Sequence, residues 1–227
     1  MDINQSEGLQ RGNNVYFQWG RKDPFVGINE FMHNKTWYDG SGVEKVDTPP
    51  VVASPAWTAA LDETTAQDVI RNCILNPDTY CANTNMDGYY INLWSAQNTV
   101  VAANDNAVVK TVYDPSPVGY HLPASNAFTG FTSNGQFQNA TNVYGTWDET
   151  SGSWNFAKDG NTVTFQTTGF RGVNSSGLVV GSGYYWSAVP VNLIPGDASA
   201  MYLREVSTHP LASNSRAFGY SVRPVCD

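Results

Sequence analysis

The sequence predicts an α+β domain with irregular antiparallel β-sheets, one or two short helices and long loops. Two patterns support this class. Short runs of aromatic and β-branched residues recur between Gly, Asn and Pro turns, which is typical of strands. One segment that starts near Thr65 instead repeats its apolar residues at helical spacing.

The first elements follow a polar beginning. Residues 1–13 are expected to form a disordered or linker N-terminus, and residues 14–227 a single domain. Residues 14–20, NVYFQWG, have the composition of a first strand. Residues 26–60 lack a regular period and contain TPPVV, so we expect a long surface loop.

The predicted helix has five apolar residues at positions i, i+3, i+4, i+7 and i+8. They are Ala66, Val69, Ile70, Cys73 and Ile74. Asn76-Pro77 ends this helix, because the residue before a proline avoids helical geometry. A second, brief helix is expected at residues 125–131, capped by Ser125 and limited by Gly130.

The later part of the chain contains most of the expected strands, separated by Gly and Asn turns. By composition they are residues 89–94, 110–113, 119–123, 153–157, 161–170, 184–189, 200–206 and 219–225. Alternation places Val163, Phe165, Met201 and Leu203 inside, and therefore Tyr202 outside. The apolar runs around Trp19, Trp94 and Trp186 assign these three side chains to the core.

Composition excludes several classes of function. The formal charge of −8 and the lack of Lys and Arg clusters argue against nucleic-acid binding. No apolar run reaches the roughly 20 residues that cross a bilayer. His33, His121 and His209 belong to no catalytic motif, and the acidic residues are scattered, so no enzyme activity, metal or cofactor is expected.

The opening MDINQSEG has no basic or apolar region and is not read as a secretory signal. The three cysteines are Cys73, Cys81 and Cys226, without a C-x-x-C pair, which disfavours a zinc site. Cys73 and Cys81 lie on either side of the Asn76-Pro77 break. A disulfide between them and a free thiol at Cys73 are both open alternatives.

The proline-rich segment at residues 110–123, KTVYDPSPVGYHLP, resembles a motif of the FISUMP domain, named from Fibrobacter succinogenes major paralogous proteins. Other segments resemble that family in the same order along residues 14–225. They are YFQWGRKDPF, ILNPDTY, TTGFR, GSGYYWSA, AMYL and RAFGYSVRPV. At Ser116 relatives commonly have cysteine. The resemblance implies a C-type lectin-like fold with paired chain ends and recognition loops.

The family resemblance further implies an adhesin-like binding domain of a bacterial surface or fimbrial tip protein, located outside the cell. Its partner is expected to be a glycan or a host or bacterial surface protein, with other pilus subunits as possible assembly partners. Residues 184–225 are also similar to the variable region of retroelement-diversified proteins. A formylglycine-generating-like oxidase is a weaker alternative, because such enzymes use a cysteine pair near this end and only Cys226 lies there.

The expected ligand-binding residues lie on or beside the closing strands. Tyr202 and Arg204 face outward by alternation, and four more residues are assigned to neighbouring loops rich in Gly, Pro and Ser. Those four are Asn192, Asp197, His209 and Asn214. An aromatic ring, a forked cation and amides are groups that hold sugars or protein loops. Arg216 and Arg223 belong to the RAFGYSVRPV motif, where a structural role is expected.

Overall fold

The structure is a computed structural model of the chain, which describes slightly more than half of its residues in several ranges. The described residues are 15–26, 37–38, 44–45, 51–52, 71, 74–75, 80–81, 92–97, 102–133, 143–172, 178–179, 181–191 and 196–227. The expected N-terminal segment 1–13 and the Cys73–Cys81 alternatives lie outside this part, except for the backbone of Cys81.

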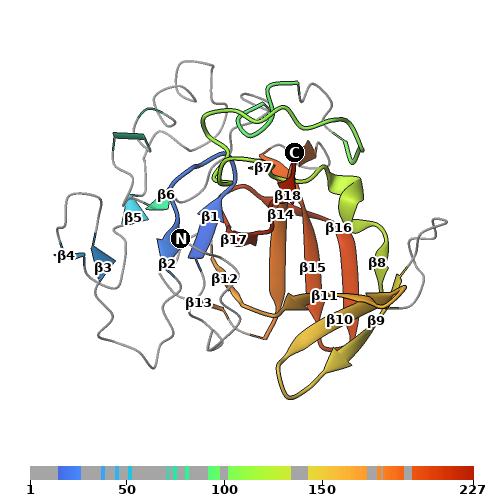
Figure 1. Cartoon of the computed structure of the whole chain (residues 1–227). Coiled ribbons are helices and arrows are strands. Elements are labelled where there is room, and N and C mark those ends of the chain that lie inside the picture. The colour runs from blue at the N-terminus through green and yellow to red at the C-terminus, as the bar shows by residue number, and fades with distance from the viewer. Residues whose placement is uncertain are drawn as a thin grey trace.

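A mixed sheet of eight strands forms the centre of the described part (Figure 1). Its main path runs β13-β12-β17-β14-β15-β16, and β1 pairs with both β17 and β2. The strands are β1 Val15–Gln18, β2 Phe25–Val26, β12 Phe170–Arg171, β13 Leu178–Val179, β14 Gly183–Val191, β15 Asp197–Arg204, β16 Ser207–Ser215 and β17 Gly219–Val222. The β14–β17 pair is parallel and the other pairs are antiparallel.

A second sheet has the order β11-β10-β9-β8, and three two-stranded ladders complete the described pairing. The second sheet comprises β8 Phe131–Thr132, β9 Val143–Asp148, β10 Ser153–Lys158 and β11 Asn161–Gln166. The ladders join β3 Trp37–Tyr38 to β4 Glu44–Lys45, β5 Val51–Val52 to β6 Tyr80–Cys81, and β7 Tyr120–His121 to β18 Val225–Cys226. The expected loop at residues 26–60 therefore contains short strands.

The predicted α+β class, including the helix-containing C-type lectin-like fold, is wrong for the described part, which is mainly β. No α-helix has its bounds within the described residues, where the one bounded helical element is the 3-10 helix η2, Ser125–Phe128. Arg71, Ile74 and Leu75 have helical backbone, but the rest of the predicted helix lies outside the described part. Ile74, expected on its apolar face, is 51% exposed.

Two hydrophobic clusters pack against opposite faces of the central sheet. Trp186 and Ala200 belong to the first cluster, whereas their chain neighbours Tyr185 and Met201 belong to the second. Successive side chains of a strand point to opposite faces, so this division places one cluster on each side. The second cluster joins the central sheet to Trp154, Phe156 and Phe165 of the second sheet.

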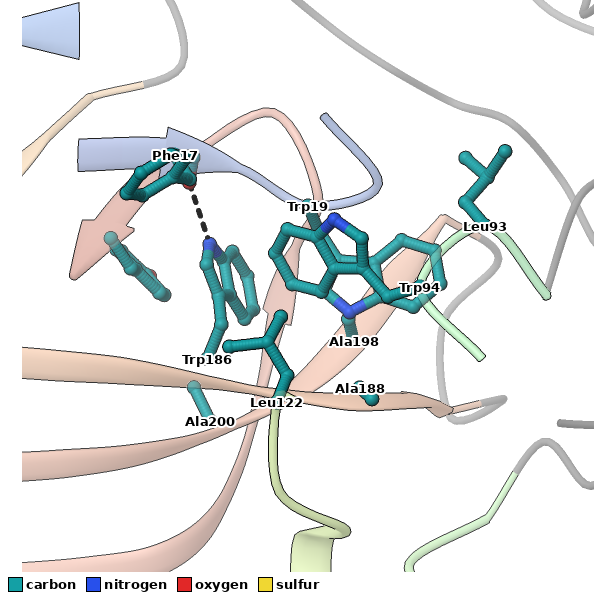
Figure 2. Packing of buried hydrophobic residues seen from close by; sticks show 10 residues of the cluster. Phe17, Trp19, Leu93, Trp94, Leu122, Trp186, Ala188, Ala198 and Ala200 are labelled. Atoms are coloured by element: carbon teal, nitrogen blue, oxygen red, sulfur yellow. Dashed lines mark hydrogen bonds between the residues drawn. The ribbon is translucent and has the colours of Figure 1, made fainter. Parts of the chain in front are cut away.

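Three tryptophans form the centre of the first cluster, and each indole N–H has a backbone acceptor. Trp186 Nε1 donates to the carbonyl of Phe17 at 2.8 Å, as Figure 2 shows. Trp19 donates to Ser187 and Trp94 to Arg21. The core assignment of these three side chains is confirmed, and their bonds remove the penalty of burying an N–H group.

Several strand predictions are confirmed. The chain ends pair antiparallel, with Phe17 opposite Tyr220 in the β1–β17 ladder. Phe165, Met201 and Leu203 are buried, and Val163 packs against the same cluster, as alternation predicts.

Other expected elements differ from the structure. Residues 92–94 and 112–113 are turns and bends in place of strands. In contrast, β9 and β16 were not expected. The η2 helix begins at Ser125 without a side-chain cap, because the Ser125 hydroxyl exchanges hydrogen bonds with the Asn104 backbone.

The proline-rich segment 113–123 is held by side chains at its beginning. Lys110 Nζ donates to the carbonyl oxygens of Ser116, Pro117 and Tyr120 at 2.5, 2.7 and 2.8 Å. The buried Asp114 accepts two backbone N–H groups from within the loop. These contacts fix the loop beside the β7–β18 ladder and support a structural role for the KTVYDPSPVGYHLP motif.

Candidate ligand-binding surface

A row of four aromatic side chains crosses four strands of the central sheet. We call Tyr220 of β17, Tyr184 of β14, Tyr202 of β15 and His209 of β16 the aromatic row. The strand register produces it: Tyr184 lies opposite Tyr202, and Tyr202 lies opposite His209. In the parallel β14–β17 pair, Tyr185 lies opposite Ser221, which places Tyr184 beside Tyr220.

The rings of the aromatic row are nearly parallel. Ring centroids are 4.3 Å apart between Tyr220 and Tyr184, 4.5 Å between Tyr184 and Tyr202, and 5.6 Å between Tyr202 and His209. The interplanar angles of these three pairs are 17°, 14° and 17°. Tyr184 and Tyr202 thus each stack between two other rings. Both faces of these two rings are therefore covered, which leaves their edges and phenol hydroxyls for other contacts.

The aromatic row passes from the core to the surface. Tyr220 is buried, whereas Tyr184, Tyr202 and His209 are partly exposed. Burial raises the pKa of Tyr184, and the nearby charge of Arg204 partly opposes this. Neither the Tyr184 nor the Tyr202 hydroxyl has a hydrogen-bond partner in the part of the chain that the structure describes.

Arg204 stands at the exposed end of the aromatic row. Its Cζ lies 4.9 Å from the ring centroid of Tyr202, two positions earlier on the same strand. Such a cation–π contact limits the positions of the guanidinium without using its N–H donors. Across the described ranges, no carboxylate pairs with Arg204, although the chain carries 20 acidic and 12 basic side chains.

Three of the six sequence-predicted site residues come together here: Tyr202, Arg204 and His209. Sequence reasoning assigned His209 and Asn214 to loops, but both belong to β16, and Asp197 begins β15. In the β15–β16 ladder, Asp197 and Asn214 lie at the end remote from Arg204. Asn214 Nδ2 is buried with no hydrogen-bond partner in the described part. Asn192 lies outside the described residues.

Asp197 is inward-facing and occupies a structural position. It is 5% exposed, and Ser213 Oγ donates to its Oδ2 at 2.7 Å. Burial raises the pKa of Asp197, while the Ser213 hydrogen bond and the Arg216 charge act in the opposite direction. Arg216 is itself buried over the Trp19 ring, and burial lowers its pKa to about 10, with Asp197 opposing the change. These contacts make Asp197 the acidic neighbour of a buried cation.

Sequence reasoning missed Tyr184, which carries the middle of the aromatic row. A signal was present, because Tyr184 precedes Trp186 by two positions and alternation puts both on one face. Phe170 and Phe218 extend the same face, with centroids 4.9 Å and 5.5 Å from Tyr184 and Tyr220. The surface is thus the outer margin of an aromatic core.

Within the described ranges, no group of three or more His, Cys, Asp and Glu side chains is arranged to hold a metal ion. Cys226 is a free, exposed cysteine. No helix in those ranges has the length and apolar character needed to span a membrane.

No protein-family model matches the chain, and comparisons with curated proteins and with solved structures also return no match.

Proposed function

We propose that the chain is an extracellular ligand-binding module, an adhesin-like domain of a bacterial surface or fimbrial tip protein that recognises a glycan or a protein without catalysis. One observation carries this proposal. The aromatic row leads from the buried Tyr220 to the partly exposed Tyr202 and His209, and the unpaired Arg204 stands beside it. Rings, hydroxyls and a cation on a rigid sheet are suited to recognition.

The rigidity of this surface supports a binding role. Tyr184 and Tyr202 are fixed by stacking and by the β14–β15 ladder, so little side-chain freedom is lost when a ligand binds. Ligand groups approaching the row would meet two free hydroxyls and the imidazole of His209. Those groups both donate and accept hydrogen bonds, which matches the hydroxyl groups of sugars and the amides of protein loops.

The location at a bacterial surface is proposed from the resemblance of the motifs to FISUMP domains. It rests on the sequence motifs alone, because the helix-containing fold expected from it is wrong for the described part. The proposed partner is a glycan or a protein on a host or bacterial surface, with other pilus subunits as assembly partners. The location is outside the cell, at the surface or on a fimbria.

A glycan array combined with a pull-down from mucus tests the proposal. The wild-type protein is compared with a Tyr202→Ala/His209→Ala double variant, which removes the exposed part of the aromatic row. Tyr144→Ala is the matched control, because Tyr144 is 64% exposed on β9 of the other sheet. Melting temperatures of all three proteins establish that they are folded.

We expect specific array or mucus ligands to bind the wild-type protein and the Tyr144→Ala control alike, and to be lost by the folded double variant. Undiminished binding by that double variant would show that recognition takes place elsewhere. Failure of the wild-type protein to bind any glycan or mucus component would contradict the binding function itself.

A further inference from the structure

The proposed binding function does not specify the chemical class of the ligand. The surroundings of Arg204 indicate which class it is. Resting on that function, we infer that the ligand is an acidic sugar, a uronic or sialic acid residue, whose carboxylate binds the Arg204 guanidinium. The hydroxyls of Tyr184 and Tyr202 then contact the sugar's own hydroxyl groups.

The first argument is the pairing of charges. Arg204 is exposed, and no carboxylate of the described part neutralises it, in a chain whose formal charge is −8. The planar guanidinium is suited to hold a carboxylate through two parallel hydrogen bonds, which are stronger than bonds between neutral groups. The contact with Tyr202 keeps this group at the margin of the aromatic row. Arg204 is thus a positioned cation that lacks its anion.

The second argument is the arrangement of the rings. A neutral sugar is commonly held by stacking on an open aromatic face. That mode is closed at Tyr184 and Tyr202, because each ring lies between two other rings of the row. What remains is a set of edges and hydroxyls beside a cation. Affinity must then come from polar contacts, which favours a sugar that carries a charge.

The third argument separates a sugar from an acidic peptide. Extended peptides often bind by adding a strand to an open sheet edge, and β16 is the edge next to Arg204. This edge is blocked. The Thr208 N–H donates to Ser133 Oγ at 3.2 Å, and the Ser133 N–H donates to Thr208 Oγ1 at 3.0 Å. Pro210, two residues later, has no N–H to offer.

The inference is tested with two pairs of probes that differ in one carboxylate. They are galacturonic acid against its methyl ester, and sialyllactose against its methyl ester. Binding is measured by calorimetry and by titration of the isotope-labelled protein, following the Arg204 side-chain N–H signal. A short peptide rich in Asp and Glu is the third ligand, because it offers carboxylates without sugar.

Three variants accompany the probes. Arg204→Gln removes the positive charge. Arg204→Lys keeps the charge but cannot form the two parallel hydrogen bonds of a guanidinium. Lys158→Gln is the control, because it removes one exposed positive charge from β10 of the second sheet. Each variant is first shown to melt at the wild-type temperature.

We expect at least one acidic sugar to bind about tenfold or more tightly than its neutral counterpart, as one lost charge-assisted pair implies. Arg204→Gln should abolish that preference, Arg204→Lys should retain part of it, and Lys158→Gln should leave it unchanged. Equal binding of acid and neutral sugars, or an acid preference that survives Arg204→Gln, overturns the inference. The inference is also overturned if only the acidic peptide binds, or if neither acidic sugar binds.

The two proposals fail in different ways. If neutral ligands bind and depend on Tyr202 and His209 but not on Arg204, the binding function stands and the acidic sugar is excluded. If an array ligand binds regardless of the Tyr202→Ala/His209→Ala change, the surface itself is wrong.

Discussion

The carboxylate of Asp114 accepts the backbone N–H of Leu122, eight positions further along the chain, at 3.0 Å. Its other oxygen accepts the N–H of Ser116 at 2.7 Å. Prolines at 115, 117 and 123 have no N–H, so the loop between these residues can form few backbone hydrogen bonds. Asp114 holds two of the remaining donors, and this contact closes the proline-rich loop.

Asp114→Ala should therefore destabilise the fold. Asp114 is buried, and its removal leaves the Ser116 and Leu122 N–H groups without their acceptor. Hydrogen bonds to a charged group contribute about 1.5 to 3 kcal/mol each, so for two bonds we expect a loss of roughly 3 to 6 kcal/mol in the free energy of unfolding. Urea denaturation measures it. The exposed Asp105→Ala is the control, and equal stabilities of the two variants would contradict this role for Asp114.

Leu203→Ala tests which alternate side chains of β15 point into the core. Leu203 is 0% exposed and packs in the cluster between the two sheets. Large-to-small changes in a core remove buried surface and leave a cavity, so we expect a loss of about 2 to 5 kcal/mol in the free energy of unfolding. Val206→Ala, at a side chain 80% exposed, should change it by less than about 0.5 kcal/mol. A Leu203→Ala protein as stable as the Val206→Ala protein would refute the packing.

The buried face of a strand could be predicted from the sequence where apolar and polar residues alternate strictly, as around Phe165 and Leu203. The nine residues of β16, STHPLASNS, have the composition of a loop, and their polar residues with Pro210 gave no strand signal. Pairing with β15 imposes the strand. The register shifts between Ala200 and Tyr202, which accommodates the irregularity near Pro210.

The candidate site was predictable only in part for a related reason. Alternation within one strand gives the outward direction of Tyr202 and Arg204, and both lie as predicted. The stacking partners Tyr184 and His209 depend on the register between strands, which no single strand encodes. Asp197 was misassigned because its segment was read as a loop. Alternation counted back from Met201 would have placed it on the buried side.

Asp197→Asn should change the stability little at neutral pH. The pKa of Asp197 is raised, so burial outweighs the Arg216 charge and the Ser213 hydrogen bond, and the folded protein on balance disfavours the ionised carboxyl. Urea denaturation at neutral pH measures the effect. Ser213→Ala is the matched control, since it removes the hydrogen bond to Asp197 but keeps the charge, and it should destabilise the protein more. A loss of about 3 to 5 kcal/mol for Asp197→Asn, as for a broken buried ion pair, would contradict the dominance of burial.

The pH dependence of Asp197 has a defined sign. Burial raises the pKa of its carboxyl in the folded state, so between the unfolded and folded values the folded chain binds more protons. The contribution of Asp197 to the free energy of unfolding therefore rises as pH falls through the folded pKa. We expect the stability of the wild-type protein relative to Asp197→Asn to increase in mild acid. A relative stability that decreases over the same range would show that the pKa is lowered.

Tyr185→Phe tests a connection between the two sheets. The Tyr185 hydroxyl donates to the carbonyl of Gln166 at 2.8 Å and accepts the Gln166 N–H at 3.1 Å. Removal of this hydroxyl leaves both backbone groups without their partner, and we expect a loss of about 1 to 3 kcal/mol in the free energy of unfolding. Tyr144→Phe, at an exposed ring of β9, is the control and should change little.

The stability difference between the wild-type protein and Tyr185→Phe should also depend on pH in the alkaline range. Burial raises the pKa of Tyr185 to about 12, from the ordinary value near 10. Between these values the folded protein keeps a proton that the unfolded chain loses, so the contribution of Tyr185 to the free energy of unfolding falls as pH rises. Arg216 titrates in the same range but is present in both proteins, and its effect cancels in the comparison. The stability advantage of the wild-type protein over Tyr185→Phe should therefore shrink from about pH 9 to about pH 11.5, as measured by urea denaturation. An advantage that stays constant or grows over this range would mean that the Tyr185 hydroxyl ionises as an exposed phenol does and does not form the buried connection to Gln166.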